Sequence, residues 1–134
     1  MSASSNHLAF NINLLKASFN RLLKAPPFNG EEIMQDDQDF LEQLVSLVKA
    51  LEENDGEALY SGQEALARLV RCYPQLVHLF ERDLFWFFGG DCLHYMPDEE
   101  IEQFQQLDEL RHDAEAAGET FNIEEARVKV FKLH

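Results

Sequence analysis

Apolar residues recur along the chain at intervals of three and four positions, and short runs of strict alternation are missing. Intervals of three and four gather side chains on one face of an α-helix, whereas alternation is typical of strands. The pattern therefore predicts an all-α protein, in which residues 1–134 form a single compact domain of five to six helices.

Signals that stop or begin helices divide this pattern into segments. The stop signals are Pro26-Pro27, Asn54-Asp55-Gly56, Gly89-Gly90 and Gly118. Capping boxes, which begin helices, are recognised at Ser61 and Asn122. The predicted helices are about 6–24, 31–53, 62–72, 74–88, 97–118 and from 122 onward.

The segment from Pro74 to Phe88 differs from the others because apolar residues surround it on nearly every side. Those residues are Leu76, Val77, Leu79, Phe80 and the run from Leu84 to Phe88. A helix without a broad polar face needs neighbours all round. We therefore expect this helix to be the centre of the array, and the loss of Phe80 or Phe87 to lower stability strongly.

The charge of the chain is strongly negative, with 11 Lys and Arg against 25 Asp and Glu and a net charge of −14. Nucleic-acid binding needs clustered bases that neutralise phosphates, so we expect no binding to DNA or RNA. The first 30 residues differ, because they hold three bases and no acid. An acidic surface favours basic partners.

The N-terminal residues and the cysteines bear on where the protein acts. The chain begins Met-Ser-Ala-Ser-Ser-Asn-His, which is not a signal peptide, and no apolar run is long enough to span a bilayer. Cys72 and Cys92 are too few for a disulfide framework. A cytoplasmic protein with reduced thiols and no membrane contact is expected.

The segment Gly89–Met96 is the best candidate for a functional site. It joins a permissive Gly-Gly backbone to ionisable side chains beside a run of aromatic residues. The candidate ligand- or partner-binding residues are Trp86, Asp91, Cys92, His94 and Tyr95. A nucleophilic Cys92 paired with His94 is one hypothesis; the alternative is a structural crossing between helices, with Cys92 packed inward. No catalytic residue is assigned.

A metal site is the second chemical hypothesis, because Glu109 and His112 form a Glu-x-x-His motif. Di-iron bundles use two such motifs, facing inward with two further carboxylates. Only one copy occurs here, and helical geometry places both side chains away from the face that carries Leu107 and Leu110. Phosphate-binding loops and zinc-protease motifs are missing too, so no metal and no cofactor is expected.

The first predicted helix suggests an interaction surface. Its apolar stripe is Leu8, Ile12, Leu15, Phe19 and Leu22. Phe10 and Leu14 lie off that stripe and would suit a homodimer through this helix; the alternative is that the helix docks only on its own core. The favoured function is non-enzymatic protein–protein contact. The alternatives are a small-ligand binder or enzyme with a pocket beside Gly89–Met96, and an acidic mimic of nucleic acid.

A resemblance covers about residues 73–112. The stretch from Asp83 to Ile101, Asp-Leu-Phe-Trp-Phe-Phe-Gly-Gly-Asp-Cys-Leu-His-Tyr-Met-Pro-Asp-Glu-Glu-Ile, and the Phe-Gln-Gln-Leu-Asp-Glu that begins at Phe104 carry it. These residues resemble a family of small, uncharacterised gammaproteobacterial proteins that are all-helical. The resemblance implies a bacterial cytoplasmic origin, and it implies no reaction and no catalytic residues.

Overall fold

The computed structural model describes residues 3–132, and their side chains from His7 onward. Six α-helices and two 3-10 helices (η) follow one another in these residues, without a strand. They are α1 (Ala3–Leu22), α2 (Gln35–Glu52), α3 (Ala58–Cys72), η1 (Pro74–Leu79), α4 (Arg82–Phe88), η2 (Gly90–Tyr95), α5 (Asp98–Ala116) and α6 (Ile123–Phe131). The all-α prediction is confirmed.

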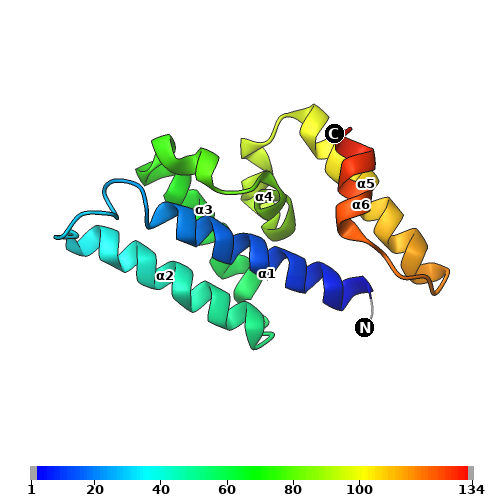
Figure 1. The fold of residues 1–134 in the computed structure, drawn as a ribbon, viewed down its shortest axis with the longest axis horizontal. Helices are drawn as coiled ribbons and strands as arrows, with labels where there is room; N and C mark the ends of the chain where they lie inside the picture. The colour runs from blue at the N-terminus through cyan, green and yellow to red at the C-terminus, as the bar shows by residue number, and fades with distance from the viewer. Residues whose placement is uncertain (1–2, 133–134) are drawn as a thin grey trace.

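The helices form a layered array with a hairpin at one end (Figure 1). α1 and α2 run antiparallel side by side, and α3 packs against α2, η1, α4 and η2. α4 also contacts α1, so it lies between α1 and α3. α5 and α6 pack on each other, and α5 joins the rest through α1 and α4. Buried apolar side chains from all six α-helices belong to one cluster.

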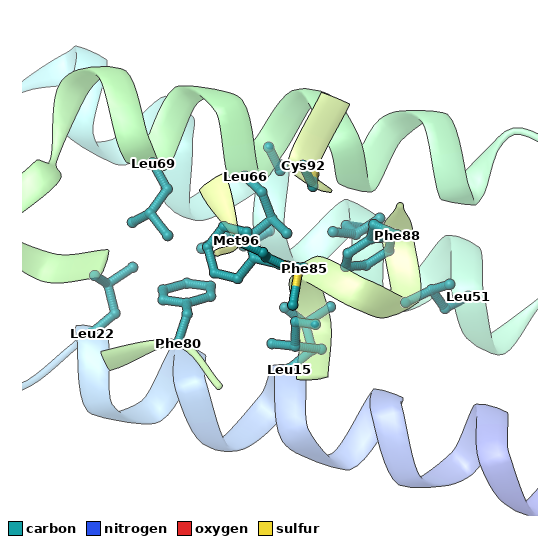
Figure 2. Close-up of a cluster of buried hydrophobic side chains, with 14 of the residues drawn as sticks. Leu15, Leu22, Leu51, Leu66, Leu69, Phe80, Phe85, Phe88, Cys92 and Met96 are labelled. Carbon is teal, nitrogen blue, oxygen red and sulfur yellow. The ribbon is translucent and has the colours of Figure 1, made fainter. Parts of the chain in front are cut away.

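The middle of this cluster lies between α1 and α3 (Figure 2). Phe85 of α4 is fully buried there, with Leu15 of α1 on one side and Leu66 of α3 on the other. Burying aromatic and leucine side chains is the main favourable term in folding, at about 25 cal/mol per Å² of apolar surface. The segment 74–88 therefore does supply the centre of the core.

That segment is two helices rather than the single predicted one. η1 ends at Leu79, and Phe80 and Glu81 are extended, with ψ of 133° and 139°, before α4 begins at Arg82. In a continuous helix the carbonyl of Leu79 would accept from the amide of residue 83. Here it accepts instead from Nε of Arg21 in α1, at 2.8 Å. A hydrogen bond from a residue 58 positions earlier in the chain thus stabilises the break between η1 and α4. The spacing of apolar residues in the segment does not reveal this break.

The buried face of α1 is rotated from the predicted stripe. The fully buried positions are Asn11, Leu15, Ser18 and Leu22. Two of these are polar, and each donates to a carbonyl one turn earlier: Asn11 to His7 at 3.0 Å and Ser18 to Leu14 at 2.8 Å. The helix backbone satisfies these donors, so polar residues occupy a face that hydrophobicity alone did not assign.

The ends of the other helices agree in part with their signals. The Asn122 cap is confirmed, since its Oδ1 accepts from the amide of Glu125 at 3.0 Å. α2 begins at Gln35, four residues after the predicted start at Glu31, because Met34 is extended. The capping box at Ser61 is wrong: α3 begins at Ala58, and Ser61 lies in its first turn with its amide donating to Glu57.

Gly62 consequently lies inside α3 rather than at its start. An ideal Cβ at this position would come within 2.1 Å of two ring carbons of Phe88. The ring of Phe88 is buried and cannot swing into solvent. Glycine is therefore needed at Gly62 for the close approach of α3 and α4.

Gly62→Ala is expected to destabilise the protein by about 1–2 kcal/mol. Alanine favours an isolated helix over glycine by about 1 kcal/mol. The forced displacement of the buried Phe88 ring costs about 2–3 kcal/mol, the upper part of the range for overpacked cores, because the added Cβ would come so close to it. Urea denaturation measures the difference. Gly56→Ala is the control, because no atom lies within 4 Å of a Cβ there. A Gly62→Ala protein as stable as the parent would contradict the close approach.

Candidate functional site

Four of the five predicted site residues lie on η2, directly after the two glycines. Gly89 and Gly90 have φ of 66° and 57°, which side chains other than glycine rarely adopt. Asp91 and His94 project into solvent, with side chains 93% and 82% exposed and Oδ1 4.0 Å from Nε2. The structure thus brings these two together as an exposed pair, on a short helix rather than on the expected loop.

Cys92 points the other way, into the core (Figure 2). Its residue is 1% exposed, and burial, with a smaller contribution from Asp91, raises the pKa of the thiol to about 11. The thiolate is the nucleophilic form of cysteine, so the thiol is protonated at neutral pH. The inward packing that the sequence offered as the alternative is what the structure shows for this side chain.

Trp86 and Tyr95 make contacts elsewhere. Trp86 of α4 faces α5, where its Nε1 donates to Oδ2 of Asp108 at 3.0 Å and its ring stacks on Phe104 with centroids 6.0 Å apart. Tyr95 sets its ring edge-on to the buried Phe85. The five residues therefore do not converge on one point, and their binding role stays a prediction.

The Glu109 and His112 pair is exposed on α5, as helical geometry predicted. Nδ1 of His112 lies 3.8 Å from Glu115 on the same helix. Among the described residues, no three His, Cys, Asp or Glu side chains are grouped so that they could hold a metal ion.

The clearest surface feature is an apolar groove along the exposed side of α2. It consists of two adjoining hollows of about 720 and 350 Å³ that share Val45. The lining residues outside α2 are Glu31 and Ile33 of the preceding segment and Lys16, Phe19 and Asn20 of α1. From α2 come Gln38, Leu41, Glu42, Leu44, Val45, Ser46, Val48, Lys49 and Glu52.

The sequence of α2 contains apolar residues that indicate this groove, beside the apolar stripe that marks the buried face of the helix. Phe40, Leu44, Leu47 and Leu51 are the buried residues of α2. Leu41 and Val45 follow two of them by one position and so lie on a neighbouring face. Val45 is 55% exposed. Two apolar residues beside a complete buried stripe therefore indicated a second apolar surface.

Charges of both signs border the groove. Glu31 and Glu42 lie at the end nearest the start of α2. At the other end Nζ of Lys16 pairs with Glu52 at 3.4 Å, and Lys49 makes no ion pair with any described residue. The groove thus has an acidic end and an end that carries one positive charge in excess.

The sequence did not predict a buried ion pair between Asp83 and Arg127. Asp83 is only 6% exposed, and both of its carboxylate oxygens accept from Arg127 of α6, at 2.9 and 3.0 Å. The Arg127 guanidinium also lies over the rings of Phe10 and Phe131, at 5.6 and 5.8 Å. In the sequence Asp83 is one of the few polar residues within the apolar segment 74–88, and nothing there points to Arg127, so only the fold reveals the pair.

The same contact bears on the predicted dimer surface. Phe10 is half-buried under Arg127, and Leu14 is half-buried against the core cluster. Both side chains are therefore partly used within the chain. A homodimer through them stays a prediction.

Comparison with known proteins places this fold in a family. A family model described as PA2817-like matches residues 3–134, which extends the resemblance drawn over about residues 73–112 to nearly the whole chain. Comparisons with curated proteins and with solved structures found no match. Within residues 3–132, no helix combines the length and the apolar content that crossing a bilayer requires. The chain belongs to the PA2817-like family.

Proposed function

We propose that this protein acts without catalysis, by binding an amphipathic helix of a partner protein in the groove along α2. The observation that carries the proposal is the continuous apolar surface centred on the half-exposed Val45. A helix laid in an apolar groove is a recurring mode of peptide recognition, with anchors at i, i+3, i+4 and i+7.

The dimensions of the groove suit a helix. Its lining residues on α2 run from Gln38 to Glu52, and at 1.5 Å per residue this is about 21 Å of helix. A partner segment of about 14 residues matches that length. Ile33 supplies an apolar wall to the hollow near the start of α2, and Phe19 of α1 supplies one to the other hollow.

The charge favours a basic partner. Glu31 and Glu42 border one end of the groove, and the whole chain carries −14. Lysine or arginine beside the apolar anchors of the partner would meet these carboxylates and be attracted by the whole field. A second copy of this acidic chain would be repelled, which makes it the less favoured occupant.

A cytoplasmic site of action is part of the proposal. Both cysteines are unpaired, Cys72 exposed and Cys92 buried. Free thiols persist in a reducing compartment. Mass spectrometry of alkylated protein from cells would report their state there.

The test uses a labelled 14-residue model helix with leucines at anchor spacing and lysines elsewhere, titrated in fluorescence anisotropy. Val45→Gln is expected to weaken its binding about fivefold, because about 1 kcal/mol of apolar contact is lost. Val128→Gln is the matched control, since Val128 is 49% exposed on α6, outside the groove lining. If the two variants bound the peptide with equal affinity, the proposal that the groove is the binding site would be wrong.

The charge is tested separately. Glu42→Gln is expected to weaken binding about two- to threefold at low salt, and the loss should shrink as salt screens the pair. Glu109→Gln, at an exposed position of α5, is the control. A glutamate version of the peptide that binds equally well, or a dimer abolished by Val45→Gln in sedimentation, would contradict a basic partner.

A further inference from the structure

His7 lies where the start of α1 meets α4 and α5. Its ring is edge-on to Phe87 of α4, with centroids 5.8 Å apart and planes at 64°. Its backbone carbonyl accepts the side-chain amide of Asn11 at 3.0 Å. The imidazole is therefore part of the packing that joins the first described turns of α1 to the rest of the chain.

This contact contains buried polar atoms without hydrogen-bond partners in the structure. They are Nδ1 of His7, Oδ1 of Asn11 and Nε of Arg111. A buried polar group without a partner costs about 1–3 kcal/mol, and a charged one costs more. The His7 residue is half-buried, so burial favours a neutral imidazole over an imidazolium here.

Charged groups from two helices face the imidazole. Asp83 belongs to α4, and Asp108, Arg111 and Glu115 belong to α5. Arg111 lies 3.6 Å from Asp108 and 3.7 Å from Glu115, while Asp83 is held by Arg127. The carboxylates are thus already paired with arginines and offer little to a new positive charge.

The balance of these effects disfavours protonation. Burial is the largest cause that lowers the pKa of His7 below 6.5, and Arg111 adds to it. Asp108, Asp83 and Glu115 act in the opposite direction without reversing the shift.

We propose that His7 makes the packing of the start of α1 acid-sensitive: the neutral ring stabilises the contact with α4 and α5, and protonation releases it. His7 in the released helix has its ordinary pKa of about 6.5. The contact therefore has its full stability above about pH 6.5 and becomes less stable as the pH falls below that value. For each pH unit below 6.5, the fraction of molecules with the start of α1 released rises by up to about tenfold. This proposal is independent of the proposed groove. The α1 residues that line the groove are Lys16, Phe19 and Asn20, and they lie beyond the start of the helix.

Two measurements on the intact chain test the proposal. NMR titration of the imidazoles should give His7 a midpoint below its ordinary value of about 6.5. Amide-exchange protection of residues 11–14, corrected for the intrinsic rate, should fall by up to about tenfold between pH 7 and 5.5. Protection at Leu15–Leu22 should fall less.

The variant His7→Gln, which cannot titrate, should remove this pH dependence, whereas His94→Gln should retain it. A His7 midpoint at or above 6.5 would overturn the proposal even if His7→Gln failed to fold, because the titration uses the parent protein. Equal protection at pH 7 and 5.5 would overturn it as well.

Discussion

Phe85→Ala is expected to lower the free energy of unfolding by about 3–5 kcal/mol, the usual loss when a buried aromatic side chain is removed. Phe85 is fully buried between α1 and α3, with Leu15 and Leu66 around it (Figure 2). Helices on both sides limit collapse into the cavity, and the size of the cavity left behind sets the cost. Urea denaturation with an unchanged m-value measures it.

Phe87→Ala is the matched control for that experiment. Phe87 lies two positions further along α4, but it is only half-buried, so its loss should cost clearly less. The sequence predicted Phe80 and Phe87 as costly positions, and the structure separates them, since Phe80 is 2% exposed. Equal losses for Phe85→Ala and Phe87→Ala would show that the centre of the core is misplaced.

The parts of the fold that follow from local chemistry were predictable. Helical spacing identified the helices because one buried face leaves a periodic trace in the sequence. The Asn122 cap and the helix end at Gly89 depend on residues within one turn, and both were found. The central place of 74–88 followed from its lack of a broad polar face.

The parts that depend on distant residues were not predictable. The break at Phe80 and Glu81 is accompanied by the bond from Arg21 to the carbonyl of Leu79, which no local window contains. The error at Ser61 has the same origin, because Gly62 serves the approach of Phe88 rather than the start of a helix. Tertiary packing overrode a valid local signal in each case.

The candidate site shows the same division. The Gly-Gly backbone of Gly89 and Gly90 was read correctly as unusual, with positive φ at both. The sequence left two hypotheses open for the side chains after it, a pairing of Cys92 with His94 or inward packing of Cys92. A 3-10 helix sends Cys92 inward and His94 outward, which agrees with the second for Cys92. The sequence cannot show which face of so short a helix is buried, because a six-residue segment contains too few turns for a periodic trace.

Arg127→Met is expected to lower the free energy of unfolding by about 3 kcal/mol, far more than one surface ion pair contributes. The change leaves the carboxylate of Asp83 buried without its two donors. Removing one member of a buried pair costs more than the pair itself contributes, because the remaining charge has lost its solvent. Arg127 keeps some exposure, which places the loss at the low end of the usual range.

The double variant Asp83→Leu with Arg127→Met separates that penalty from loss of packing. It should regain most of the stability lost in Arg127→Met alone, because no buried charge remains. Arg82→Met is the control: Arg82 pairs with Glu100 at 2.7 Å, but the arginine side chain is 38% exposed, so its loss should cost about 1 kcal/mol or less. If the double variant were as unstable as Arg127→Met, the effect would come from the contacts of Arg127 with Phe10 and Phe131, and the buried charge would not be its cause.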